Sequence, residues 1–165
     1  MVVLEFLDCM EAELNKLFEG MVFDNSTGGK SGMHVLKQDF PIRKYKADEK
    51  KADEKKKEID LFPYCIIRVE DGTAASLQTV DIAITFGICE KGEENNGELR
   101  ILNLIERVCQ RFLNDRVIGG KFRLDYDAPI RWGLPKDEKS TYPYFYGLIE
   151  MTWDSFFETE EDRYV

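Results

Sequence analysis

The sequence predicts a single α+β domain over residues 1–165, in which a largely antiparallel β-sheet is packed by one main helix. Between Gln78 and Cys89, large apolar residues alternate with polar or small ones, which is typical of a strand with one buried face. Between Glu98 and Asn114, apolar residues instead recur at the spacing of an amphipathic helix. The strands between this helix and an N-terminal helix come as hairpins, which argues against a parallel, doubly wound sheet.

The N-terminal segment is predicted to form a second amphipathic helix. Its apolar residues recur at helical spacing from Val3 to Met21, and acidic residues fill the opposite face. Gly20 is expected to end it. Helices that lie on membranes carry Lys and Arg on the polar face, so this acidic helix is expected to pack on the chain's own core.

A loop of turn-forming residues, DNSTGGKSG, follows at Asp24–Gly32. Its GGKS sequence invites comparison with a phosphate-binding loop, but that motif requires a glycine at the position of Asp24. The loop also leads into Met33–Leu36, a predicted strand, and not into a helix whose N-terminus would face a phosphate. We therefore expect a surface loop that binds no nucleotide, and a surface or strand-edge position for His34.

A tandem KADEK repeat and two further lysines occupy residues 46–57. The segment has no apolar stripe with which to dock on a core. We therefore expect it to form the exposed, charged tip of a long protruding hairpin, whose arms are Phe40–Tyr45 and Glu58–Glu70. A charged finger that touches a partner is the functional alternative for this tip.

Further strands are predicted by alternation and by the turn residues around them. They are Tyr64–Glu70, Phe122–Tyr126 and Tyr144–Trp153, and Ile130–Trp132 follows Pro129 between the last two. The first is expected to close at Asp71–Gly72, a dipeptide that marks turns. Residues 154–165 are expected to form an acidic C-terminal tail.

Composition limits the function. The net charge of −9 argues against a protein that grips nucleic acid by neutralising phosphates. The single histidine rules out a multi-histidine metal site within one chain. The four cysteines form no C-x-x-C pair, so we expect buried, inert thiols in a reducing, cytoplasmic setting. We assign no catalytic residue, cofactor or metal, and no apolar run approaches the ~20 residues that span a membrane.

The C-terminal region carries more large apolar residues than one small core readily absorbs. Aromatic residues of this kind most often fill cores or interfaces, and sheet edges are commonly covered by a neighbouring subunit. The candidate oligomer interface consists of Tyr142, Tyr144, Tyr146, Phe156 and Phe157.

The order of segments from Val80 to Trp153 resembles the core of bacteriophage tail-terminator, or tail-completion, proteins of phages and prophages of Gram-positive bacteria. The resemblance is carried by VDIAITFGI, LRILNLIERV, KFRL, IRWGLP and YPYFYGLIEMTW. Such proteins share the fold of tail-tube subunits and need no cofactor. They form a ring, typically a hexamer, which ends the tail tube and joins it to the head connector protein.

The resemblance implies a structural protein of the virion tail or neck, made in the bacterial host cytoplasm, and not an enzyme. An acidic ring is consistent with DNA that passes through without binding. Two alternatives remain open. One is another phage neck or minor structural protein. The other is a small ligand-binding domain or enzyme that uses Tyr142, Tyr144, Phe145 and Tyr146 as a pocket wall.

Overall fold

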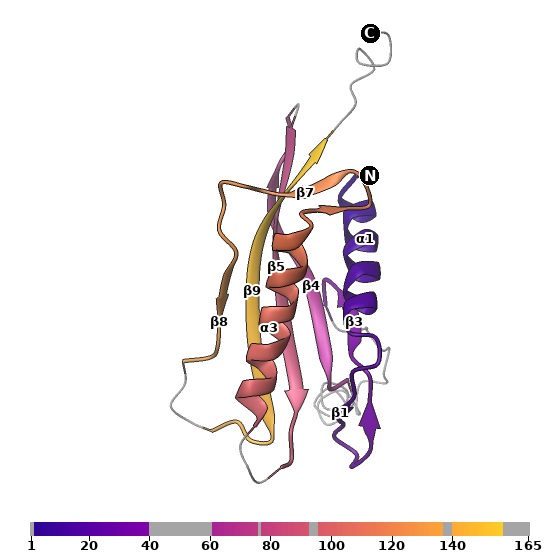
Figure 1. Cartoon of the computed structure of the whole chain (residues 1–165), viewed down its shortest axis with the longest axis vertical. Helices are drawn as coiled ribbons and strands as arrows, with labels where there is room; N and C mark the ends of the chain where they lie inside the picture. Colours follow the sequence, from indigo (N-terminus) through magenta and orange to yellow (C-terminus); the bar gives the residue numbers. More distant parts are fainter. Residues whose placement is uncertain (1, 40–60, 76, 93–95, 137–139, 157–165) are drawn as a thin grey trace, which may run out of the picture.

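A computed structural model describes residues 2–39, 61–75, 77–92, 96–136 and 140–156 of the chain. The described residues form two helices and nine strands of one mixed sheet (Figure 1). In chain order these are α1 (Val2–Leu17), β1 (Phe23–Asp24), β2 (Lys30–Ser31), β3 (His34–Lys37), β4 (Tyr64–Thr73), β5 (Leu77–Cys89), α3 (Gly97–Asn114), β6 (Val117–Ile118), β7 (Phe122–Leu124), β8 (Arg131–Gly133) and β9 (Tyr144–Phe156).

The centre of the sheet is β5, which pairs antiparallel with β4 on one side and with β9 on the other. The β5–β9 ladder runs without a register shift from Leu77↔Phe156 to Cys89↔Tyr144. The outer edge of β9 pairs with β8 near its middle and with β7 near its C-terminal end. This arrangement confirms the predicted α+β fold with a largely antiparallel sheet.

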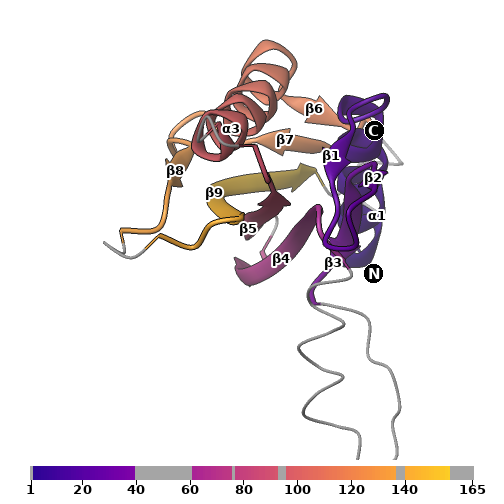
Figure 2. The ribbon, with the colours of Figure 1, turned by 90° about the horizontal axis from the view of Figure 1, so that it is seen from below.

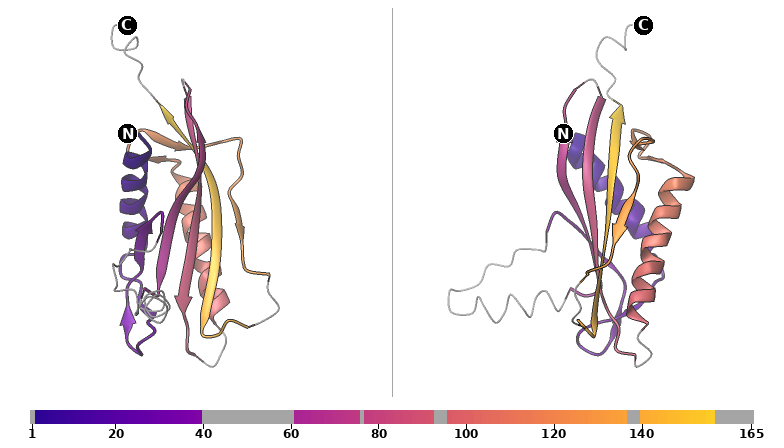
Figure 3. Two further views of the ribbon diagram at one scale, coloured as in Figure 1. Left: turned by 180° about the vertical axis from the view of Figure 1, so that it is seen from behind. Right: turned by 90° about the vertical axis from the view of Figure 1, so that its left-hand side faces the viewer.

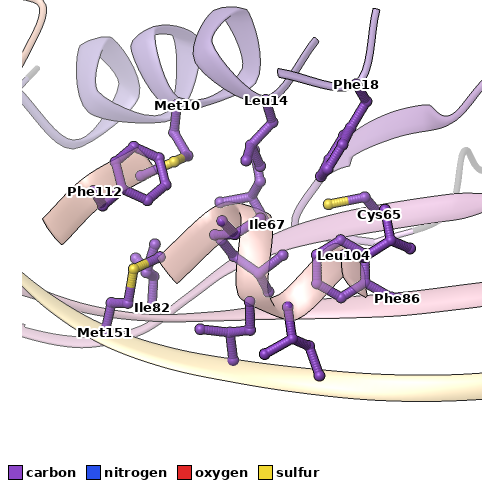
Figure 4. Close-up of a cluster of buried hydrophobic side chains, with 14 of the residues drawn as sticks. Met10, Leu14, Phe18, Cys65, Ile67, Ile82, Phe86, Leu104, Phe112 and Met151 are labelled. Atoms are coloured by element: carbon purple, nitrogen blue, oxygen red, sulfur yellow. The ribbon is translucent and has the colours of Figure 1, made fainter. Parts of the chain in front are cut away.

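Both helices cover the same face of the sheet (Figure 2). The rings of Phe6 on α1 and Phe112 on α3 lie 5.6 and 5.1 Å from the ring of Trp153 on β9. Phe18, just beyond α1, meets Phe86 of β5 at 6.0 Å. Figure 4 shows side chains of both helices converging on β4, β5 and β9.

The alternation predicted in β5 is confirmed. The side chains of its apolar set are each at most 4% exposed, and this set is Val80, Ile82, Ile84, Phe86 and Ile88. They point toward the helices because successive residues of a strand face opposite sides of the sheet. The helix predicted from Glu98 to Asn114 is also confirmed, since α3 begins one residue earlier and ends at Asn114.

Three details of the sequence interpretation were wrong. Asp71 and Gly72 do not form a turn but continue β4, where a bulge after Val69 shifts the register by one residue. β3 and β4 pair in parallel, so the strands do not all come as hairpins. Asp154 and Ser155 belong to β9 and are buried, so the tail does not begin at residue 154.

The long hairpin proposed for residues 40–60, with its KADEK tip at 46–57, lies outside the described residues. So does the acidic tail from residue 157 onward. The second predicted arm, Glu58–Glu70, contains Tyr64–Glu70, and these residues belong to the main sheet as part of β4.

Candidate functional site

The face of the sheet turned away from α1 and α3 is called the open face here. The right-hand view of Figure 3 looks onto it. It consists of side chains from alternate positions of β4, β5 and β9, which the registers place in rows. One row is Tyr64, Gly87 and Tyr146; the next is Ile66, Thr85 and Leu148; the next is Arg68, Ala83 and Glu150. The open face therefore changes from aromatic to aliphatic to charged along the strands.

The aromatic end is built around Phe62, which precedes β4 and is only 2% exposed. Its ring centre lies 5.0 Å from that of Tyr64, 4.7 Å from Tyr144 and 6.0 Å from Tyr146. Cys89 is fully buried against the same group. We call these four rings the aromatic cluster. It forms a second, smaller core on the side of the sheet turned away from α1 and α3.

A groove of about 690 Å³ runs over the open face beside the aromatic cluster. Its floor includes Tyr146 and Leu148, and one wall is the segment from Arg131 to Lys136. The first part of this wall, β8, pairs with β9 as far as Gly133↔Leu148. Beyond Gly133 the ladder ends, because Pro135 has no amide hydrogen to donate. Trp132 is 56% exposed, and because it pairs with the buried Ile149 its side chain lies on the helix side of the sheet.

The charged end of the open face carries both signs. Arg131 on β8 lies directly across from Glu150 on β9. Arg68 donates from Nε to the carbonyl oxygen of Gln38 at 3.1 Å. A second hollow of about 280 Å³ lies here, and its lining combines Glu70, Asp81 and Glu150 with the apolar Ala128, Pro129 and Met151. A ligand or partner on this face would thus meet apolar and charged groups in one surface.

The structure brings together only part of the predicted interface. Tyr144 and Tyr146 are half-buried members of the aromatic cluster. Tyr142 is 52% exposed and lies apart from them, with its hydroxyl donating to the carbonyl oxygen of Lys91 at 2.8 Å. Phe156 pairs with Leu77 at the opposite end of β9, and Phe157 lies outside the described residues.

Sequence reasoning missed Phe62 and Leu148 as members of this surface. Phe62 stands before a predicted strand, and nothing in its neighbourhood shows that it folds onto β9. Strand β8 was not predicted, and its pairing with β9 depends on contacts distant in sequence. Leu148 carried a usable signal, because it continues the alternation of Tyr144 and Tyr146 along one face of β9.

The GGKS loop is a β-hairpin between β1 and β2. The side-chain oxygen of Asn25 accepts hydrogen bonds from the amides of Thr27 and Gly29 at 3.2 and 2.8 Å. These amides are therefore used by the turn itself. Met33–Leu36 was predicted as a strand, and β3 confirms it. This geometry lacks the helix N-terminus on which a phosphate-binding loop depends.

His34 is exposed on β3, which pairs on one side with β4, as predicted for a strand-edge position. Its Nδ1 lies 3.1 Å from the carbonyl oxygen of Leu61 and 3.0 Å from that of Pro63. Because carbonyl oxygens only accept, Nδ1 carries the hydrogen. His34 therefore holds the start of β4 against β3.

The cysteines are free thiols. Cys65 and Cys89 are buried as predicted, whereas Cys9 and Cys109 are half-buried. Burial raises the pKa of all four thiols, and the carboxylate of Glu5 contributes to the raised pKa of Cys9. A raised pKa lowers the fraction of reactive thiolate. In the part of the chain that the structure describes, no three His, Cys, Asp or Glu side chains gather as metal ligands would.

Neither described helix is both long and apolar enough to cross a membrane. The chain matches no protein-family model, and no curated protein is significantly similar to it.

Proposed function

We propose that this protein is a structural subunit of a phage or prophage, which forms a homo-oligomeric ring that ends the tail tube and joins it to the head connector protein. The ring is of the tail-terminator type that the segments from Val80 to Trp153 resemble. The work of the protein is then contact with like subunits and with tail proteins, and it needs no cofactor or catalytic residue.

The observation that carries this proposal is the open face. In the part of the chain that the structure describes, both helices lie on one side of the sheet. The other side presents Tyr144, Tyr146 and Leu148, which are half-buried, and Glu150, which is exposed. Aromatic residues set in a partly polar surface are enriched where proteins meet. A sheet with one uncovered face of this composition is well suited to be covered by another subunit.

Charge supports the role in the tail. A ring through which DNA passes should not retain it, and like charges on ring and phosphate prevent binding. The chain has a net charge of −9. The charged end of the open face includes Glu70, Asp81 and Glu150, with Arg68 and Arg131 beside them.

The test is the arrest of tube growth. Phage tail-tube subunits are polymerised with and without this protein, and tube lengths are measured by electron microscopy. We expect a terminator to shorten the tubes and to appear as a cap at one end. A matched addition of protein carrying Tyr146→Asp, which places a charge in the aromatic cluster, should be less effective. Tubes of unchanged length that carry no cap would reject the proposal.

A second candidate function is supported by the groove, whose volume of about 690 Å³ lies within the ~300–1,000 Å³ range of small-molecule sites. In that case the floor at Tyr146 and Leu148 would hold an apolar or aromatic ligand. A thermal-shift screen separates the two functions. A ligand that stabilises the wild-type protein but not Leu148→Arg would favour a binding domain, whereas a closed oligomer would favour the ring.

A further inference from the structure

The outer surface of α3 is the feature of this chain that best matches the open face in length and chemistry. The residues of α3 that point away from its own sheet form one exposed stripe, and they are Leu99, Asn103, Glu106, Gln110 and Leu113. Leu99 is 64% exposed and Leu113 is 51% exposed. The stripe therefore has an apolar residue at each end and polar residues between them, with Arg107 exposed alongside.

The dimensions of the two surfaces agree. α3 has 18 residues, which gives a length of about 27 Å at 1.5 Å per residue. The part of β5 from Thr79 to Gly87 pairs with both β4 and β9, and at ~3.4 Å per residue it is about 30 Å long. Three strands spaced ~4.8 Å apart are about 14 Å wide, and a helix with side chains needs ~10 Å.

The order of chemical groups agrees as well. Leu99 and Arg107 are about 12 Å apart along a helix, which is close to the separation of about 13 Å between Tyr146 and Glu150 along a strand. Leu99 and Leu113 are about 21 Å apart along the helix, which is close to the separation of about 20 Å between Tyr146 and Thr152 along the strand. Thr152 lines the second hollow, together with the apolar Ala128, Pro129 and Met151.

We infer that α3 of one copy of this protein packs on the open face of the next copy. Leu99 then lies on the aromatic cluster, Arg107 lies beside Glu150, and Leu113 enters the second hollow. Each sheet in the assembly then has helices on both faces. Its own α1 and α3 lie on one face, and α3 of the neighbouring copy lies on the other. This inference rests on the proposed function and names the surfaces by which the ring forms.

The contact is head to tail. The open face and the outer surface of α3 lie on opposite sides of the same subunit, because α3 packs between its own sheet and solvent. Every copy therefore uses one surface of each kind. A contact between two different surfaces repeats until the rotation closes a ring.

Charge reversal tests the pairing of Arg107 with Glu150. We expect Arg107→Glu and Glu150→Arg each to weaken self-association about ten-fold or more, because each places like charges together across the contact. The double variant Arg107→Glu/Glu150→Arg restores opposite charges and should associate within about three-fold of the wild-type protein. Sedimentation velocity over a concentration series measures all four proteins.

Two controls carry the same changes of charge elsewhere. Lys16→Glu and Glu19→Arg alter exposed residues at the C-terminal end of α1 and just beyond it, away from both surfaces. They should associate like the wild-type protein. Thermal unfolding of every variant checks that the fold is retained.

The outcomes separate this inference from the proposed function. If the protein associates but the reversals have no effect, or the double variant is not restored, the assignment of α3 to the open face is wrong, while the proposed ring is unaffected. If the protein caps tubes while monomeric in solution, each single reversal should weaken capping and the double variant should restore it; single reversals that cap like the wild-type protein overturn the assignment. If it neither associates nor caps tubes, the proposed function fails and the inference with it.

Discussion

The ring of Tyr64 lies directly over the backbone of Gly87, its cross-strand partner. A Cβ atom at position 87 would lie 2.4 Å from Cζ of that ring and 2.8 Å from its hydroxyl oxygen. Gly87 therefore lets Tyr64 lie flat on β5, where it meets Phe62. The aromatic cluster depends on the absence of one side chain as much as on the four rings.

Replacing Gly87 by alanine should destabilise the protein by about 1–3 kcal/mol, since the added methyl group forces Tyr64 from its packed position. Urea unfolding followed by circular dichroism measures the loss. Gly133→Ala is the matched control, because a Cβ at that glycine of β8 meets nothing within 4 Å. Equal stability of the two variants would contradict the close contact.

Replacing Gly97 by alanine should also destabilise the fold by about 1–3 kcal/mol. This reverses the usual preference of helices, which favours alanine over glycine by ~1 kcal/mol. The reason is that a Cβ at Gly97 would lie 2.1 Å from Cδ2 of Phe145, where the first turn of α3 crosses β9. Asn103→Ala, on the exposed side of α3, should be neutral or slightly stabilising. A stabilised Gly97→Ala protein would show that α3 starts farther from β9.

Asp154 should make stability depend on pH. It is 6% exposed, and burial raises its pKa, as does the charge of Asp125, while Arg123 at 3.7 Å opposes the rise. The folded protein therefore holds this proton more tightly than the unfolded chain, whose pKa is about 3.9. The resulting stability is present below that value and is lost as the pH rises through the folded-state pKa.

The variant Asp154→Asn, which cannot ionise, should gain stability relative to the wild-type protein as the pH rises from about 3 to about 7. Chemical unfolding at a series of pH values gives the difference. Asp71→Asn, at an exposed position on β4, serves as the control. A difference between Asp154→Asn and the wild-type protein that falls as the pH rises would mean that the pair with Arg123 outweighs burial.

The GGKS loop should bind no nucleotide. Titration of ATP with Mg²⁺ into the protein should release no heat, and Lys30→Ala should behave as the wild-type protein does. Asn25→Ala should instead lower stability by about 1 kcal/mol, because it removes the acceptor of two turn amides. Micromolar ATP binding that Lys30→Ala abolishes would overturn this prediction.

Deleting one KADEK unit, residues 46–50, should leave the melting temperature within a few degrees of the wild-type value. The unit carries no apolar stripe, and doubling the length of a loop costs only about 0.6 kcal/mol. Differential scanning fluorimetry measures the change. A large cooperative loss would show that the repeat packs against the body of the protein.

Local patterns in the sequence were sufficient for most of the fold. Alternation predicted β5 and the start of β9, and helical spacing predicted α1 and α3, because these periods follow from backbone geometry alone. Local patterns failed where the same residue types are compatible with two kinds of local structure, such as a turn and a bulged strand. Asp71 and Gly72 are turn formers, yet the β4–β5 ladder continues through them by means of a bulge. The parallel pairing of β3 with β4 also has no local signature.

Periodicity in the sequence predicts one strongly amphipathic strand, two amphipathic helices and an aromatic C-terminal strand. The contacts of Tyr144 and Tyr146 with Phe62, which Tyr142 does not share, became known from the folded structure. So did the position of α1 and α3 on the same face of the sheet. Periodicity reports which side of an element is apolar, whereas the choice of neighbour depends on contacts between residues far apart in the chain.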